Sequence, residues 1–386
     1  MHGLDKSDLK AANERVVLNL VRSEPGISRN EIARRSELSP AAITGIVGRL
    51  MDAGLVHEER TESQGKLGRR PTALYLNPQS RLAAGVEITT AGATAALAGL
   101  DGHITVQAEI AFDEDPHRFL TAIHQCVLSL TSTAPAPVLG IGVSVPGNMD
   151  PETGRVIAST NLHWRDVDAI DLIRPGIKQP VFWENNSNLS ALAERWFRPA
   201  NLAPLDDFVF VTLKVGLGTG LIVNGALARG ARAHGGEFGH SVLYPEGYRC
   251  QCGNRGCWEE YSSDRALLRE YGSSDRTIDS QGIARLALEG DPRARAAIES
   301  VAESLGLGLV NVLMALNPAA IALDDFAVTA WPIIEPVLWR VLRDRVPAYW
   351  LTGLEVFPSM QTPLKGAIAS VLSRYFNGSL GSVLLP

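Results

Sequence analysis

The stretch Phe208-Val-Phe-Val-Thr-Leu-Lys-Val-Gly-Leu-Gly-Thr-Gly220 decides the fold of most of this 386-residue chain. Residues 208–213 are rich in β-branched and aromatic side chains, which predicts a buried strand, and the glycines that follow predict tight turns. A strongly apolar strand is also expected at residues 138–145, where Pro146-Gly147 ends it. Strand-rich segments of this kind, each followed by helical patterns, indicate two α/β lobes with a cleft between them.

The rest of the chain agrees with an α/β protein that contains no membrane span. Strands are predicted at residues 82–88 and 94–100, and a helix at residues 116–130. Residues 305–323 are nearly long enough to cross a bilayer, but Asn311 and Asn317-Pro318 interrupt them. We interpret this segment as a buried helix, a turn and a buried strand. Because the first ten residues contain no apolar signal segment, we expect a cytoplasmic protein.

Composition and charge place the chain among globular proteins with more than one domain. Hydrophobic residues make up 45% and charged residues 20% of 386 residues, which predicts two or three domains and excludes a disordered chain. The net charge of −6 divides unevenly, with +3 on residues 1–81 and −9 on the remainder. A basic end on an acidic body favours nucleic-acid contact at the N-terminal end only.

The first eighty residues carry the signals of a helix-turn-helix. Apolar residues at helical spacing predict a first helix that Pro25-Gly26 ends: Leu9, Val16, Leu20 and Val21. A capping box of Ser28 and Glu31 opens a second helix, which runs to Ser36. Ser39 then caps a third helix, with Pro40 at its first position. Four residues of the third helix are predicted to face the core: Ile43, Ile46, Val47 and Leu50.

The third helix is the candidate DNA-recognition helix. Its opposite face offers six candidate DNA-contacting residues: Ser39, Ala41, Ala42, Thr44, Gly45 and Arg49. Most of these side chains are small, so direct readout of base edges by this helix is expected to be modest. A polar loop between two predicted strands forms a wing, where Arg69 and Arg70 are expected to contact a minor groove or phosphates. The alternative is a three-helix module that binds protein instead of DNA.

The cysteines predict a metal site. Three of the four cysteines, Cys250, Cys252 and Cys257, lie within eight residues, whereas Cys126 lies in an apolar helical pattern and is expected to be inert core. Together with His240 they supply one nitrogen and three sulfur ligands, which is the composition of a closed, structural zinc site. The alternative interpretation is a set of reduced, buried thiols.

Several motifs resemble those of the ROK family, which groups repressors and sugar kinases on an actin-like, two-lobed ATPase fold. The resemblance covers nearly the whole chain and rests on Gly140-Ile-Gly-Val-Ser-Val-Pro-Gly147, Asn161-Leu-His-Trp164, Glu184-Asn-Asn-Ser-Asn188, His234-Gly-Gly-Glu-Phe-Gly-His240 and Cys250-Gln-Cys-Gly-Asn-Arg-Gly-Cys-Trp-Glu259. The N-terminal module and the Gly68-Arg-Arg-Pro71 wing are similar to the repressor branch of the family.

The resemblance implies a domain division and a ligand set. It implies a winged helix-turn-helix at residues 1–80, a smaller α/β lobe at 81–200, and a larger α/β lobe at 201–363. A C-terminal helix at about 364–380 is expected to return to the smaller lobe. The family's zinc set matches His240 and the three clustered cysteines. Six residues fall at or beside the family's sugar-contacting positions: Asn161, Asn185, Asn186, Glu237, His240 and Glu259. His240 would then serve both the metal and the sugar.

The sequence departs from the kinases of the family at four places. Asn186 stands where they have a catalytic aspartate, and an amide cannot accept the proton of a sugar hydroxyl at neutral pH. Residues 87–92 lack the glycines of the first phosphate loop, and Lys214-Val215 replaces Gly-Thr in the second. Asp324-Asp325 places acid where the nucleotide would lie. We therefore expect no enzymatic activity and no ATP binding.

The expected function is transcription regulation. We predict a DNA-binding regulator, a repressor in the commoner case, of carbohydrate-metabolism genes, whose DNA affinity responds to a sugar bound in the inactive cleft. A palindromic operator and a homodimer or homotetramer are expected. Two alternatives stay open: a bifunctional sugar kinase, and a regulator controlled by a protein partner with a vestigial sugar pocket.

Overall fold

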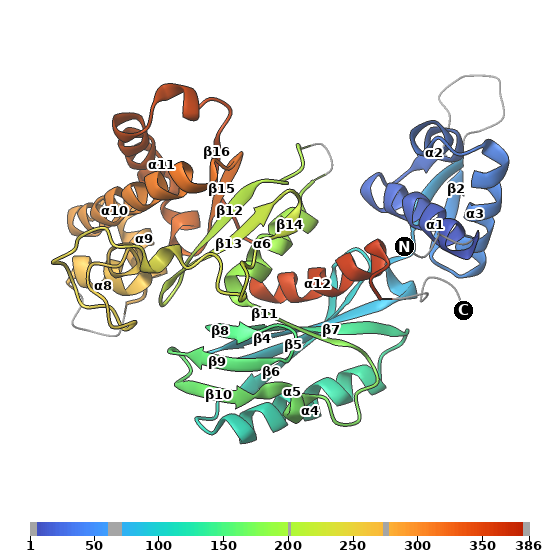
Figure 1. Ribbon diagram of the computed structural model, residues 1–386, viewed down its shortest axis with the longest axis horizontal. Coiled ribbons are helices and arrows are strands. Elements are labelled where there is room, and N and C mark those ends of the chain that lie inside the picture. Colours follow the sequence, from blue (N-terminus) through green and yellow to red (C-terminus); the bar gives the residue numbers. More distant parts are fainter. Residues whose placement is uncertain (1–5, 61–71, 200–201, 273–277, 381–386) are drawn as a thin grey trace.

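A small three-helix module lies at the N-terminal end of the molecule (Figure 1). The computed structural model describes residues 6–60, 72–199, 202–272 and 278–380. The module contains α1 (Lys6–Ser23), β1 (Ile27–Ser28), α2 (Arg29–Ser36), α3 (Pro40–Asp52), β2 (Val56–Arg60) and β3 (Thr72–Leu76). Its sheet has the strand order β1-β3-β2. This is the predicted winged helix-turn-helix, and the candidate wing residues Arg69 and Arg70 lie outside the described residues.

The predicted helices and caps of the module are confirmed, but not every apolar residue that predicts the first helix is buried. The Oγ atoms of Ser28 and Ser39 accept hydrogen bonds from the N–H groups of Glu31 and Ala42, both at 3.2 Å. The four predicted core residues of α3 are all buried. On α1, however, Leu9 and Val16 are 51% and 44% exposed. The buried face consists of Val17, Leu18 and Val21, because α1 packs on α3, β3 and the C-terminal helix.

The smaller lobe is built on a five-stranded mixed sheet with the order β11-β7-β4-β5-β6. These strands are β4 (Leu82–Thr89), β5 (Gly92–Gly99), β6 (Ile104–Ala111), β7 (Val138–Val145) and β11 (Val181–Asn185). Helix α4 (Pro116–Ser132) covers one face of the sheet. A second sheet, β10-β9-β8, and the short helix α5 (Ala169–Ile173) complete the lobe with β8 (Asn148–Asp150), β9 (Arg155–Ser159) and β10 (Trp164–Asp168).

The larger lobe has a second five-stranded sheet with the order β14-β13-β12-β15-β16. Its strands are β12 (Phe208–Leu213), β13 (Leu217–Val223), β14 (Ala226–Leu227), β15 (Ala320–Leu323) and β16 (Glu355–Pro358). Its helices are α7 (Glu259–Ser262), α8 (Asp264–Tyr271), α9 (Ser280–Leu288), α10 (Pro292–Leu316) and α11 (Phe326–Arg345). The predicted interpretation of residues 305–323 is confirmed, because α10 ends at Leu316 and β15 follows a left-handed Asn317. Within the described residues α10 alone is long and apolar enough to cross a membrane, and 56% of that window is buried inside the protein.

Two helices lie between the two large sheets (Figure 1). Helix α6 (Asn186–Trp196) packs on β12 and β13, and α12 (Pro363–Asn377) packs on β4, β7 and α6. The far end of α12 also shares one hydrophobic cluster with the N-terminal module, which joins Val17, Leu18 and Val21 to Leu372 and Phe376. The C-terminal helix thus contacts the smaller lobe and the N-terminal module. The predicted domain limits at residues 80, 200 and 363 stay predictions.

Candidate functional site

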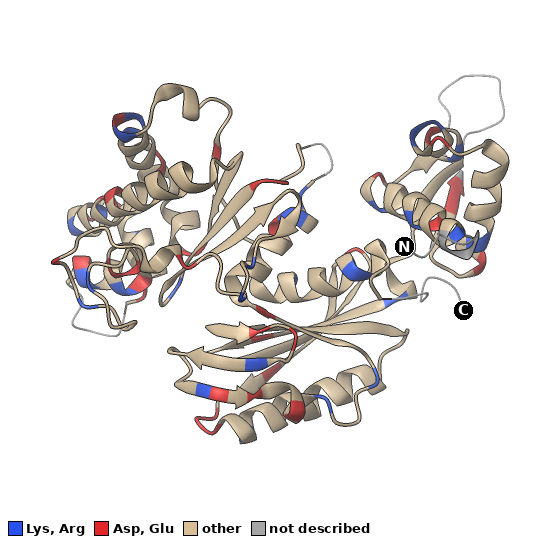
Figure 2. Cartoon of the chain, viewed as in Figure 1, with Lys and Arg blue, Asp and Glu red and all other residues tan. Residues whose placement is uncertain are grey.

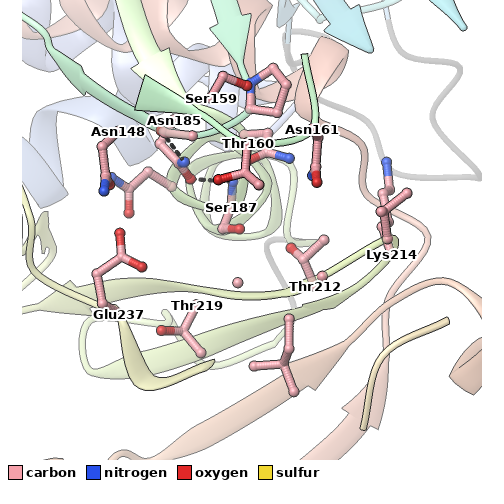
Figure 3. Close-up of a pocket in the computed structure, with 18 of the residues that line it drawn as sticks. Asn148, Ser159, Thr160, Asn161, Asn185, Ser187, Thr212, Lys214, Thr219 and Glu237 are labelled. Atoms are coloured by element: carbon pink, nitrogen blue, oxygen red, sulfur yellow. Dashed lines mark hydrogen bonds between the residues drawn. The ribbon is translucent and has the colours of Figure 1, made fainter. Parts of the chain in front are cut away.

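A cavity of about 280 Å³ lies between the two lobes (Figure 3). All six candidate ligand residues line it: Asn161, Asn185, Asn186, Glu237, His240 and Glu259. Asn161 lies in the loop after β9, Asn185 ends β11 and Asn186 begins α6. Glu237 and His240 lie in the segment that precedes the three clustered cysteines, and Glu259 begins α7. The structure therefore brings together residues that are up to about a hundred positions apart in the chain, while their contact with a sugar stays a prediction.

The start of α6 forms one wall of the cavity and is fixed by Asn185. The side-chain oxygen of Asn185 accepts from the Ser187 N–H at 2.8 Å, and its Nδ2 donates to the Gly147 carbonyl oxygen at 2.9 Å. Both ends of this amide are thus used within the protein, which gives Asn185 a structural role that the motif comparison did not predict. Asn186, the next residue, is half-buried and lines the cavity.

A buried carboxylate beside this wall ties the two lobes together. Glu184, at the end of β11, is 7% exposed. Its Oε2 lies 2.6 Å from Nε of Arg229 in the larger lobe, and its Oε1 accepts from Nδ2 of Asn188 at 2.9 Å. The sequence does not reveal this role of Glu184, because it does not show that Arg229 lies opposite.

His240 stands between the cavity and the cysteine cluster. Its Nε2 lies 3.9 Å from Oε2 of Glu237, and its Nδ1 lies 3.7 Å from Sγ of Cys250 and 3.6 Å from Oε1 of Glu259. Nε2 thus faces Glu237, whereas Nδ1 faces both Cys250 and Glu259, and the double role of His240 in metal and sugar binding stays a prediction. Burial raises the pKa of Glu237, and the neighbouring His240 and His234 oppose that rise. Because the Glu237 side chain is 46% exposed, solvent screening limits the effect.

The four candidate metal ligands converge on one point. One ligand atom from each of His240, Cys250, Cys252 and Cys257 lies within 4.8 Å of every other. The Cys252 and Cys257 sulfurs are 3.7 Å apart. A tetrahedral zinc site with Zn–S bonds of about 2.3 Å has sulfurs about 3.8 Å apart, so the set fits a metal.

The loop and the thiols around this point also fit a metal. Gly253 and Gly256 adopt positive φ values of 97° and 70°, which lets the loop turn tightly between the ligands. Desolvation by burial raises the pKa of the Cys250 thiol and, largely for the same reason, raises the pKa of Cys257 to about 11. Without a metal these thiols stay protonated, so thiolate ligation requires the cation itself.

A salt bridge crosses the cleft where the family resemblance places phosphate loops. Lys214, just after β12, has its Nζ 3.7 Å from Oε1 of Glu87 on β4. The other carboxylate oxygen of Glu87 accepts from the Leu364 N–H, at the start of α12, at 3.2 Å. The turn beside Glu87 is closed by Thr89, whose Oγ1 donates to the Gly92 carbonyl oxygen at 3.1 Å. Charged and β-branched side chains thus occupy this part of the cleft.

The acid at Asp324 faces the protein interior and does not line the cavity. Asp324 is 4% exposed and accepts from the Leu213 N–H at 2.8 Å. Burial raises its pKa to about 7, and burial likewise raises the pKa of Asp264 to about 7. That Asp324-Asp325 places acid where a nucleotide would lie stays a prediction, and the structure adds that Asp324 itself is buried and bonded to Leu213.

The candidate DNA-contacting face of α3 is open, with one exception. Five of its residues are exposed: Ser39, Ala41, Ala42, Thr44 and Gly45. Arg49 instead places its Nε 2.7 Å from Oε1 of Glu14, which is 4% exposed. This pair ties α3 to α1, so Arg49 has a structural role that the sequence did not reveal. Both signs of charge occur on the module (Figure 2), and on α2 Glu31 pairs with Arg34 and Arg35.

Comparison with protein families assigns the two parts of the chain separately. The model described as "ROK family" matches residues 83–338, and the model described as "Winged helix-turn-helix DNA-binding" matches residues 11–57. The chain is 28% identical to the xylose repressor of Bacillus subtilis, over 97% of this chain and 98% of that protein. It is 27% identical to the DNA-binding transcriptional dual regulator NagC of Escherichia coli, over 98% and 96% of the two chains.

Solved structures give the same picture. A ROK family transcriptional regulator described as a homologue of the E. coli MLC protein superposes with a TM-score of 0.79 at 25% identity, over 97% of this chain and 99% of that one. A ROK family glucokinase from Streptomyces griseus, in complex with glucose and AMPPNP, superposes with a TM-score of 0.64 at 26% identity. It covers 76% of this chain and 98% of its own. The regulator thus matches the full length, whereas the kinase leaves about a quarter of this chain unmatched.

Proposed function

The chain belongs to the ROK family, and from that membership we propose that it is a DNA-binding repressor of carbohydrate genes whose operator affinity is set by a sugar in the cleft. The observation that carries the proposal is the cavity itself. Six polar residues at or beside the family's sugar-contacting positions line one space between the lobes, in a chain whose N-terminal module exposes a recognition helix. A DNA-binding module and a polar ligand cavity in one chain are what a ligand-controlled regulator requires.

The cleft is proposed to bind without catalysing. Asn186 cannot act as a general base, and loss of base catalysis alone lowers rates by roughly 10²–10⁴. The proposal is supported by the Lys214–Glu87 pair and the Thr89 turn, which lie where the family resemblance places the phosphate loops. ATP is accordingly not expected as a cofactor.

The cysteine cluster is proposed to hold a structural zinc ion. His240, Cys250, Cys252 and Cys257 would supply all four ligands, which leaves no open coordination position for catalysis. The metal would fix the loop that carries the cysteines against the segment that carries Glu237. It would thereby orient Glu237 and Glu259 toward the cavity.

The partners follow from the module and from the relatives. We expect a two-fold symmetric DNA operator, read by two modules of a homodimer or homotetramer in the cytoplasm, with Arg69 and Arg70 of the wing adding contacts. The names of the relatives make D-xylose and N-acetylglucosamine the first ligands to test.

The test combines a ligand screen with an operator. The full-length protein selects an operator from a random duplex library, and thermal unfolding is followed with D-xylose, D-glucose, N-acetylglucosamine and their phosphate esters. A true effector raises the melting temperature by mass action and changes operator affinity. Glu237→Gln, at the cavity, should abolish the shift, whereas Glu289→Gln, on the exposed end of α9, should keep it. A chain that selects no operator, or an operator affinity that no binding sugar alters, would contradict the proposal.

A second candidate function is a sugar kinase that also regulates its genes. It is favoured by Gly216, Gly218 and Gly220, which the second phosphate loop retains. ATP-dependent phosphorylation of a panel sugar that disappears in Glu237→Ala would establish it. If the protein binds an operator but none of the tested sugars, control by a protein partner is the remaining alternative.

A further inference from the structure

Helix α6 connects the cleft to the DNA-binding module. Its first residue, Asn186, lines the cavity, and its last residue, Trp196, contacts α1. Eleven residues of α-helix extend over about 16 Å. The two ends of one rigid element therefore lie at the two sites that a ligand-controlled regulator has to connect.

The cleft end of α6 is held by close contacts with glycines of β13 and α12. On β13 of the larger lobe, a Cβ added at Gly220 would lie 2.2 Å from the Ser187 carbonyl oxygen, and one at Gly218 would lie 2.1 Å from its Oγ. On α12, a Cβ added at Gly366 would lie 2.0 Å from the Leu189 carbonyl oxygen. Gly220 and Gly366 meet backbone carbonyls of α6 and Gly218 meets the short Ser187 side chain, so α6 is closely packed against β13 and α12, and a movement of β13 relative to the smaller lobe is expected to displace α6.

The other end of α6 meets the DNA-binding module through an arginine between two aromatic rings. Cζ of Arg22, on α1, lies 4.1 Å from the ring centroid of Trp196 and 5.3 Å from that of Phe376 on α12. The Nε of Arg22 has no hydrogen-bond partner among the described residues, so the rings are the contacts that hold its position. One turn away, Nδ2 of Asn19 donates to the Phe376 carbonyl oxygen at 3.1 Å.

We infer that α6 transmits ligand binding in the cleft to the DNA-binding module through the contact of Trp196 with Arg22. The inference rests on the proposed function and names its regulatory element. A ligand that draws the lobes together moves β13, and β13 displaces α6. Trp196 then reorients α1 and, with it, the recognition helix α3 that packs on α1.

The first experiment measures the response in variants at the module end. The sugars of the thermal-unfolding screen are tested, D-xylose first. In the wild type, the sugar that raises the melting temperature is expected to change affinity for the selected operator about tenfold. In Arg22→Met and in Trp196→Leu the change should fall below about twofold, while sugar affinity stays within about twofold of the wild type. Arg293→Met is the matched control and keeps the full response, since Arg293 stacks on Tyr271 at 4.9 Å within the larger lobe. A full response in both folded variants overturns the inference, whereas loss of sugar binding or operator binding in the wild type overturns the proposed function.

A second experiment needs no sugar. Gly220→Ala places a methyl group against the Ser187 carbonyl and so displaces α6 in the free protein. We expect amide hydrogen exchange in α1 to change at least about threefold in this variant, and Trp196→Leu to remove that change when the two are combined. Gly306→Ala, whose added Cβ would meet the Val341 side chain at 2.9 Å, is the control. Unchanged exchange in α1 of a folded Gly220→Ala protein overturns the inference.

Discussion

Lys214 of the larger lobe and Glu87 of the smaller lobe meet across the cleft, with 3.7 Å between Nζ and Oε1. Glu87 also binds the first turn of α12 through the Leu364 N–H. The protein's own charges therefore bridge the region where the family resemblance places the phosphate loops. The proposed loss of phosphoryl transfer therefore does not rest on Asn186 alone.

Restoring the missing carboxylate should not restore catalysis. Asn186→Asp supplies a base, but Lys214, Glu87 and the Thr89 turn still occupy the phosphate region. We expect no ATP-dependent phosphorylation of any panel sugar by this variant in a coupled assay. Phosphorylation by Asn186→Asp at a rate that a further Lys214→Gly change leaves unaltered would show that the bridge is not a barrier.

Neighbouring asparagines should separate stability from ligand binding. Asn185→Ala removes the cap of α6 and the bond to Gly147, so the free energy of unfolding should fall by about 1–2 kcal/mol. Asn186→Ala removes a cavity side chain that has no capping role, so sugar affinity should fall while stability changes by less than about 0.5 kcal/mol. Denaturant unfolding and sugar titration of both variants check this, and equal loss of stability in the two would contradict it.

Zinc removal should destabilise the larger lobe. The free energy of unfolding should fall by several kcal/mol, and the melting temperature by roughly 5–10 °C, after treatment with a chelator. Cys252→Ser should lower zinc content and reproduce the shift, whereas Cys126→Ser, outside the cluster, should keep one equivalent of metal. Metal analysis of freshly purified protein that finds less than half an equivalent of zinc would exclude the site.

Asp324 should make the protein less stable as the pH rises. Its folded-state pKa is raised to about 7, above an unfolded value of about 3.9, so the folded state binds the proton more tightly. Its contribution to stability is therefore present below pH 4 and is lost as the pH rises to about 7. Asp324→Asn keeps an acceptor for Leu213 and cannot ionise. Between pH 4 and 8 the variant should gain stability relative to the wild type, by at most about 4 kcal/mol. If the free energies of unfolding of the wild type and of Asp324→Asn change in parallel with pH, the pKa of Asp324 is not raised in the folded state.

The wing arginines should control the salt dependence of DNA binding. Each phosphate contact contributes about −0.9 to the slope of log affinity against log salt concentration, so Arg69→Ala with Arg70→Ala should reduce the slope by about 2. Arg34→Ala, on the exposed face of α2, is a control within the module. Operator affinity measured at salt concentrations between roughly 50 and 200 mM gives this slope and checks the expectation. An unchanged slope would place the wing away from DNA.

Features that depend on neighbouring residues were predictable from the sequence. The caps at Ser28 and Ser39 lie within three residues of their partners, and Asn317 ends α10 by its own left-handed conformation. The cysteine cluster was equally visible, because three of its ligands lie in one short loop. That the cleft residues lie together was predictable from the family motifs, but not from their spacing along the chain.

Features that depend on contacts between distant segments were not predictable. The apolar pattern of α1 did not show that α12 would bury Val17 and Leu18 and leave Leu9 exposed. The pairing of Arg49 with Glu14 likewise depends on how α1 crosses α3. A single sequence shows which residues are charged, but not which charged residues lie next to each other in the folded protein.

The hydrophobic cluster shared by α1 and α12 has a consequence for protein engineering. Leu18 and Phe376 stand at opposite ends of the chain yet belong to one core. The N-terminal module is therefore not an interchangeable cassette. A chimaera that takes this module from one regulator and a body from another would face a foreign C-terminal helix. Transplantation should succeed only when residues 363–377 travel with the module.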